Sequence, residues 1–133
     1  MDQKISFSLT PHVVEAVIVI IDEYKASGDV LTAALEEEGM YRVYSFSRIE
    51  EALHLVGVII PDLFIIDYKL SQTTGIELYN RLQAQSTKRR VPCILLNAPP
   101  SVFQRDYLWE LNKPFGLDTL LEKVRKALHS AYV

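Results

Sequence analysis

Three short runs of large apolar residues, free of any charged side chain, constrain the fold of this chain most. They are VIVII at 17–21, LFII at 63–66 and CILL at 93–96. Runs that are apolar at every position are typical of strands covered by helices on both faces. Weaker strand patterns occur at 41–46 and 108–112. The sequence therefore predicts five short strands.

Amphipathic segments separate these runs. Four of them carry apolar side chains at helical spacing: 30–35, 49–56, 76–82 and 117–128. Ser47 and Glu50 predict a capping box at the start of the second helix, and Thr74 and Glu77 predict a cap for the third. The first helix is expected to stop near Gly39, because glycine favours the backbone conformation that ends helices.

Strand and helix thus alternate along the chain, which indicates a parallel sheet with right-handed crossovers. We predict one doubly wound α/β domain over residues 16–133, with helices on both faces of the sheet. Residues 1–15 form an N-terminal arm in which Ile5, Phe7 and Leu9 alternate with serines. An edge strand or a homodimer contact are alternatives for this arm, and a frayed terminus is the default.

Charge and composition exclude several classes of protein. The chain has 133 residues, 23% charged residues and a formal net charge of -3, which argues against binding nucleic acid by phosphate neutralisation. Its one basic run, Lys88 to Arg90, follows a predicted helix and is interpreted as a solvated helix terminus. Cys93 is the only cysteine and lies in an apolar run, so we expect it in the core. With no apolar stretch of membrane-spanning length, a cytoplasmic protein without membrane contact is expected.

Polar residues follow the predicted strands at their carboxyl ends. Asp22 and Glu23 end the first strand, Asp67 the third, Asn97 the fourth and Lys113 the last. Ligands of open α/β sheets bind beyond the carboxyl ends of the strands. We therefore expect three acids and one lysine to meet at one rim of the sheet.

Clustered carboxylates need a cation. Two like charges about 4 Å apart repel by roughly 4 kcal/mol at an effective dielectric near 20. Lys113 supplies one positive charge, and Mg²⁺, which binds carboxylates and carbonyls while keeping waters, fits the remaining demand. Asp67 stands alone on its strand and is the candidate nucleophile toward phosphorus, while Lys113 would neutralise the transferred group.

Each of these residues also has an ordinary explanation. Asp22 and Glu23 would stabilise the N-terminus of a following helix, and Lys113 would be an exposed loop lysine. The functional interpretation depends on their coincidence at separate strand ends. An aspartate-nucleophile phosphohydrolase is a weaker alternative, because the position of its second acid, two residues after Asp67, holds Lys69.

At residues 16–131 the chain resembles a response-regulator receiver domain. Asp22 and Glu23 match the acid pair of that family, and Asp67 matches its phosphoacceptor. Gly75, eight residues after Asp67, matches a family glycine. The triplet Lys113-Pro114-Phe115 reproduces the family's lysine-proline-aromatic motif.

The resemblance implies a flavodoxin-like fold with five parallel strands in the order 2-1-3-4-5. It also implies that a histidine kinase or phosphotransfer protein donates a phosphoryl group to Asp67. The implied Mg²⁺ site has four groups: the carboxylates of Asp22 and Asp67, the backbone carbonyl of Lys69, and Glu23 directly or through water. The peptide between Lys113 and Pro114 would be cis.

Several positions depart from the family pattern. Asn97 replaces the serine or threonine that contacts the phosphoryl group, although its amide can still donate a hydrogen bond. Glu110 replaces the switching aromatic, and Ser71 replaces a frequent proline. Only fifteen residues separate Asn97 from Lys113, so the fourth helix should be short or absent.

Three aromatic residues lie in or just after the shortened segment: Phe103, Tyr107 and Trp109. They would either fill the space left by the helix or transmit the signal, and the filling role is favoured.

The sequence thus leads us to expect a stand-alone receiver, with Asp67, Lys113 and Asn97 at its reactive site, that signals through an unidentified downstream protein. The alternative is a pseudo-receiver that docks partners without ever being phosphorylated. Asn97 is the residue that keeps this alternative open.

Overall fold

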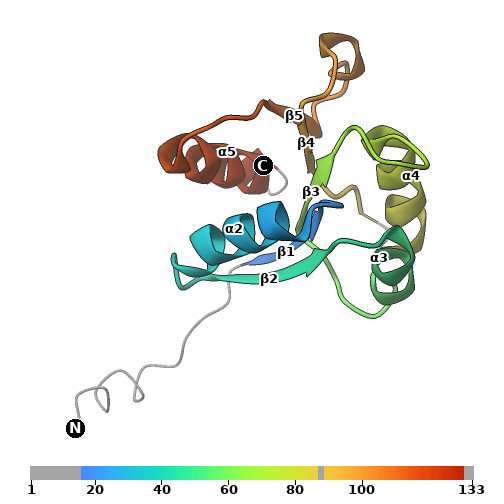
Figure 1. Cartoon of the computed structure of the whole chain (residues 1–133), viewed down its shortest axis with the longest axis horizontal. Helices are drawn as coiled ribbons and strands as arrows, with labels where there is room; N and C mark the ends of the chain where they lie inside the picture. The colour runs from blue at the N-terminus through green and yellow to red at the C-terminus, as the bar shows by residue number, and fades with distance from the viewer. Residues whose placement is uncertain (1–15, 87–88, 131–133) are drawn as a thin grey trace, which may run out of the picture.

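Five parallel strands form the centre of the protein in a computed structural model that describes residues 16–86 and 89–130. The sheet order is β2-β1-β3-β4-β5, with the topology shown in Figure 1. The strands are β1 (Ala16–Ile21), β2 (Tyr41–Phe46), β3 (Leu63–Asp67), β4 (Cys93–Leu96) and β5 (Leu108–Leu111). This confirms the predicted doubly wound α/β fold and its strand order. The predicted arm at 1–15 lies outside the described residues.

Helices cover both faces of the sheet. They are α2 (Lys25–Glu36), α3 (Ile49–Leu55), α4 (Gly75–Ser86) and α5 (Leu117–Ser130). In Figure 1, α2 and α5 lie on one face and α3 and α4 on the other. Because side chains alternate along a strand, β1 directs Ile18 and Ile20 toward the first pair of helices and Val19 and Ile21 toward the second. This two-sided burial explains why the central strands are apolar at every position.

A single turn replaces the fourth helix of the family pattern. Between β4 and β5 the described chain forms η1 (Pro100–Val102), a three-residue 3-10 helix. Phe103 and Tyr107 pack against the core on the α3 and α4 face, while Trp109 packs on the opposite face. The prediction of a short fourth helix is confirmed, and Phe103 and Tyr107 cover the core at this place.

The predicted helix ends are correct in part. The Glu77 N–H donates to Thr74 Oγ1 at 3.3 Å, as expected for the cap of α4, and Gly39 has a φ of 81° beyond the end of α2. The capping box at Ser47 is wrong, because α3 begins one residue later with Arg48 as N-cap and no side-chain cap bond. That start places Ile49 in the core, so tertiary packing overrides the local signal.

The predicted apolar face of the first helix contains one error. Leu31 and Leu35 are buried, but Val30 is 69% exposed. Burial therefore follows a narrower stripe of α2 than the apolar residues suggest. Cys93 is fully buried, as predicted.

The two arginines of the basic run that the structure describes are exposed after the end of α4, in agreement with a solvated terminus, and each also has a specific partner. Arg89 forms an ion pair with Asp62, which also accepts a hydrogen bond of 2.7 Å from the Val17 N–H. The Arg90 guanidinium lies 4.3 Å from the centre of the Tyr107 ring. These contacts tie the segment before β4 to the sheet and to the loop before β5. Among the described residues, no helix is long and apolar enough to cross a membrane.

Candidate functional site

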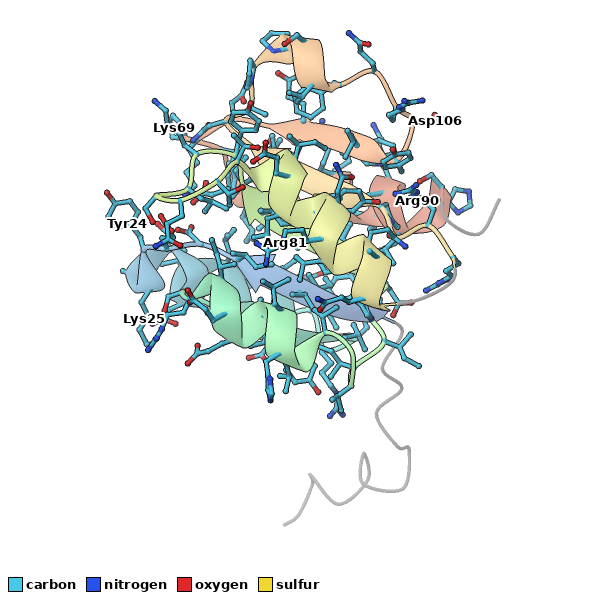
Figure 2. All side chains as sticks on the ribbon, turned by 90° about the vertical axis from the view of Figure 1, so that its right-hand side faces the viewer. Tyr24, Lys25, Lys69, Arg81, Arg90 and Asp106 are labelled. Atoms are coloured by element: carbon cyan, nitrogen blue, oxygen red, sulfur yellow. The ribbon has the colours of Figure 1, made fainter. Side chains whose placement is uncertain are left out.

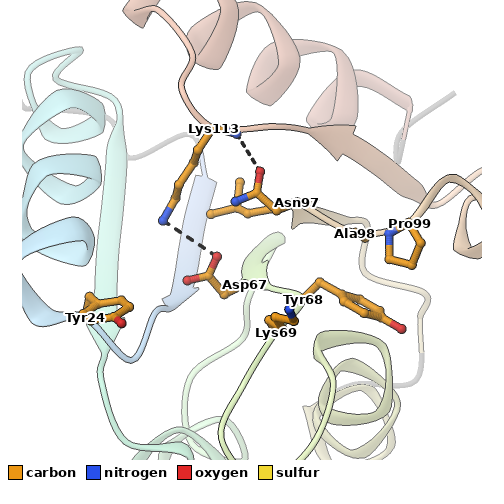
Figure 3. Close-up of a pocket in the computed structure, with 9 residues that line it drawn as sticks. Tyr24, Asp67, Tyr68, Lys69, Asn97, Ala98, Pro99 and Lys113 are labelled. Atoms are coloured by element: carbon orange, nitrogen blue, oxygen red, sulfur yellow. Dashed lines mark hydrogen bonds and ion pairs between the residues drawn. The ribbon is translucent and has the colours of Figure 1, made fainter.

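The carboxyl ends of the strands place four of the predicted residues around one rim. Asp22 follows β1, Asp67 ends β3, Asn97 follows β4 and Lys113 follows β5. A cavity of about 700 Å³ opens beside them, lined by Asp67, Asn97, Lys113 and the loop residue Lys69 (Figure 3). Tyr24 also lines it, and Figure 2 shows Tyr24 and Lys69 at the same end of the molecule, opposite Arg90. Sequence analysis missed Tyr24, whose only signal was its place directly after the acid pair.

Lys113 links two carboxylates at this rim. Its Nζ atom lies 3.2 Å from Asp22 Oδ2 and 3.7 Å from Asp67 Oδ1. The Asp22 side chain is fully buried, and its other oxygen accepts a hydrogen bond of 3.0 Å from the Tyr24 N–H. Asp67 keeps 15% of its side chain exposed, facing the cavity. Asp22 is therefore an anchored charge behind the cavity wall, and Asp67 is the carboxylate that faces the cavity.

Asp67 is harder to ionise than an exposed aspartate. The pKa of Asp67 is raised from 3.8 to about 7, first by burial and then by the hydrogen bond and charge of Asp22, while Lys113 lowers it. One ammonium therefore does not fully compensate two neighbouring carboxylates. A group with additional positive charge would be favoured at this place.

Glu23 does not join this cluster. Its carboxylate accepts hydrogen bonds from Ser71, at 2.9 and 3.2 Å from the N–H and 2.8 Å from the hydroxyl. In the described ranges, no three histidine, cysteine, aspartate or glutamate side chains are arranged to hold a metal ion. The structure thus brings Asp22, Asp67 and Lys113 together and places Glu23 against another loop.

The remaining groups still fit Mg²⁺. This ion is usually bound by one or two carboxylates together with several waters. Asp67 supplies a carboxylate that lines the cavity, and the buried Asp22, joined to it through Lys113, supplies a second one beside it. Lys69, whose backbone carbonyl the resemblance implies as a further ligand, lines the same cavity. The closeness of two carboxylates to a single ammonium is the observation that favours a cation here.

Asn97 is held by the turn that carries Lys113. Its backbone has a φ of 58°, a left-handed conformation that asparagine tolerates better than threonine does. Its side-chain oxygen accepts a hydrogen bond of 2.7 Å from the Lys113 N–H (Figure 3). Only the amide nitrogen of the side chain is left to contact a group in the cavity. The peptide between Lys113 and Pro114 is cis, as the resemblance implied.

Gly75 sets the course of the loop that leaves Asp67. Its N–H donates to the carbonyl of Tyr68 at 2.6 Å, and Lys69 pairs with Thr74 in an antiparallel bridge. A Cβ at position 75 would lie 2.5 Å from the carbonyl oxygen of Asp67. This close approach explains a glycine at the first position of α4.

The raised pKa of Asp67 predicts a pH-dependent stability in metal-free buffer. Between about pH 4 and pH 7 the folded state keeps a proton on Asp67 that the unfolded state has released, so stability falls as the pH rises through this window. Discounted for solvent screening, the loss is about 1–2 kcal/mol. Urea denaturation at pH 5 and pH 8 should therefore show Asp67→Asn gaining stability relative to the wild type as the pH rises. Parallel curves for the two proteins would contradict this.

Comparison with known proteins agrees with this geometry. The family model described as "Response regulator receiver domain" matches residues 18–125. The phosphate regulon transcriptional regulatory protein PhoB of Rhizobium meliloti is 31% identical over 123 residues, which cover 86% of this chain and 52% of that protein. The KDP operon transcriptional regulatory protein KdpE of Escherichia coli is 33% identical over 125 residues, with the same coverage. The chain thus spans about half the length of these curated relatives.

Solved structures show the same fold. The chemotaxis protein CheY4 of Vibrio cholerae superposes with a TM-score of 0.75 at 24% identity, covering 84% of this chain and 98% of that one. A likeness at this identity concerns the fold alone, whereas the family model covers most of the sequence. The chain therefore belongs to the response-regulator receiver domain family.

Proposed function

We propose that this receiver accepts a phosphoryl group on Asp67 from a histidine kinase or a phosphotransfer protein, in a reaction that depends on Mg²⁺. The observation that carries the proposal is the position of the Asp67 carboxylate, which borders the cavity beside Asp22 and Lys113. An acid that is both reachable and flanked by a cation is suited to attack phosphorus.

The residues divide the chemistry among them. An Asp67 oxygen forms the new bond to phosphorus while the bond from phosphorus to the donor nitrogen breaks, and the electron pair of that bond stays on the donor, which gains a proton. The Lys113 ammonium neutralises charge on the transferred group. Asp22, anchored by the Tyr24 N–H, would hold Mg²⁺, which when bound supplies further positive charge to the phosphoryl oxygens.

The phosphorylated domain would signal through contacts with a downstream protein rather than act as an enzyme. A net charge of -3 argues against nucleic acid as a direct ligand of this domain, and the single buried Cys93 suits a reducing, cytoplasmic compartment. The curated relatives are named as transcriptional regulatory proteins and are about twice as long as the matched segment. We propose only the receiver's own role here.

Mass spectrometry after incubation with Mg²⁺ and acetyl phosphate tests the proposal. We expect a gain of one phosphoryl group in the wild type, and none in Asp67→Asn or in EDTA. Asp106→Asn is the matched control, because it makes the same substitution at an exposed acid outside the cavity and should be phosphorylated normally. Modification of Asp67→Asn to the wild-type extent would rule out Asp67 as the acceptor.

One observation favours the phosphorylation-independent alternative. The Asn97 side-chain oxygen is committed to the Lys113 N–H, so this residue differs from a hydroxyl that is free to follow a phosphoryl group. A pseudo-receiver would gain no mass with acetyl phosphate and none with a phosphorylated histidine kinase. That result would support docking as the function of this domain.

A further inference from the structure

Two loops on the rim are joined through Glu23. This residue follows β1, whereas Ser71 lies in the loop between β3 and α4, 48 positions further along the chain. The Ser71 N–H contacts both carboxylate oxygens, at 2.9 and 3.2 Å, and its hydroxyl donates to one of them at 2.8 Å. We call this set of contacts the Glu23–Ser71 clasp.

Glu23 is separated from the reactive cluster by three observations. It does not line the cavity that Asp67 and Lys113 border. Lys113 Nζ pairs with Asp22 and Asp67, whereas the Glu23 carboxylate is bonded to Ser71. No trio of potential metal-binding side chains is found in the part of the chain that the structure describes. The second member of the acid pair is therefore turned away from the first.

The identity of residue 71 makes the clasp feasible. A proline at this position would supply neither a backbone N–H nor a hydroxyl, so neither type of donor to Glu23 would exist. Serine supplies both, and hydrogen bonds to an ionised carboxylate are stronger than those between neutral groups. A cation that recruited Glu23 would have to break these bonds first.

We propose that Ser71 is a positioning residue that withholds Glu23 from the cation, so that Mg²⁺ is bound by Asp22 and Asp67 without the second member of the acid pair. This inference rests on the proposed Mg²⁺-dependent function and concerns the same rim. Its consequence is a lower affinity for Mg²⁺ than the three acids would give together, because ligand charge is one determinant of divalent-ion affinity.

Isothermal titration with MgCl₂, without any phosphodonor, tests the clasp. Ser71→Pro removes both donors and should lower the dissociation constant by about tenfold, which corresponds to about 1.4 kcal/mol. Ser71→Ala keeps the backbone N–H and should lower the dissociation constant by a smaller factor. This variant tests the clasp even if the proline variant misfolds. Glu23→Gln should leave the wild-type affinity unchanged, as should Glu77→Gln, an exposed glutamate bonded to Thr73 near the same loop.

A double variant shows whether Glu23 is the source of the Mg²⁺ affinity gained by Ser71→Pro. Glu23→Gln combined with Ser71→Pro should return the affinity to the wild-type value. The inference is overturned if Glu23→Gln alone weakens binding several-fold, or if Mg²⁺ binds the wild type and both Ser71 variants equally. Failure of the wild type and of every variant to bind Mg²⁺ would refute the clasp together with the metal dependence of the proposed function. Normal Mg²⁺ binding without any phosphorylation would refute only the proposed phosphorylation of Asp67.

Discussion

Gly75→Ala is expected to lower the free energy of unfolding by about 2–4 kcal/mol. A Cβ at this position would lie 2.5 Å from the carbonyl oxygen of Asp67 and 2.9 Å from the Cα of Tyr68. Both atoms belong to the backbone, so no side chain can rotate away to relieve the overlap. The loop between β3 and α4 would have to move, and Asp67 would move with it. Urea denaturation followed by circular dichroism measures the loss.

Gly57→Ala is the matched control for this substitution. Gly57 is exposed, and a Cβ there would meet no atom within 4 Å. Its replacement should leave stability nearly unchanged or raise it slightly, because alanine restricts the unfolded chain. Equal unfolding free energies for the two alanine variants would show that the close approach at Gly75 is not a real constraint.

Lys113→Met is expected to destabilise the metal-free protein by about 2–3 kcal/mol at neutral pH. The substitution keeps a long side chain but removes the ammonium that lies 3.2 Å from the buried Asp22 carboxylate and 3.7 Å from Asp67. Among the described residues, Lys113 is the cation that pairs with both carboxylates, so the two adjacent acids would lose this positive charge. Part of the stability should return in MgCl₂, because a bound cation would replace the missing charge.

Lys25→Met provides the comparison for the lysine variant. Lys25 also forms an ion pair, with Asp29 at 3.0 Å, but both side chains are largely exposed. Exposed pairs contribute about 0–1 kcal/mol, so this variant should unfold nearly as the wild type does, with no specific response to MgCl₂. An equal loss of stability in the two variants would mean that Lys113 behaves as an ordinary surface lysine.

The sequence alone determined the architecture of this domain. Strands buried on both faces must be apolar at every position, and few other elements leave that pattern in so short a run. When strands and helices alternate, parallel strand pairing and right-handed crossovers leave few possible topologies. In such a sheet, ligands are expected to bind at the carboxyl ends of the strands. The meeting of Asp22, Asp67 and Lys113 at one rim follows from this placement.

Local signals were less reliable where the core competed with them. Ser47 and Glu50 have the spacing of a capping box, yet α3 starts one residue later because that start buries Ile49. Arg89 and Arg90 are exposed, as their composition suggests, but only the fold brings them to Asp62 and Tyr107. Contacts between distant segments are not encoded in the preferences of neighbouring residues.

The tertiary structure alone decided how the polar side chains are used within the site. The position of Glu23 after β1 does not tell whether its carboxylate turns toward Asp67 or toward Ser71. Likewise, the position of Asn97 after β4 does not reveal that its side-chain oxygen accepts a hydrogen bond from the Lys113 N–H. These choices depend on side-chain rotamers and on hydrogen-bond distances between loops that are far apart in the sequence. The periodicity of apolar residues encodes which face of an element is buried, but it carries no information about such directions.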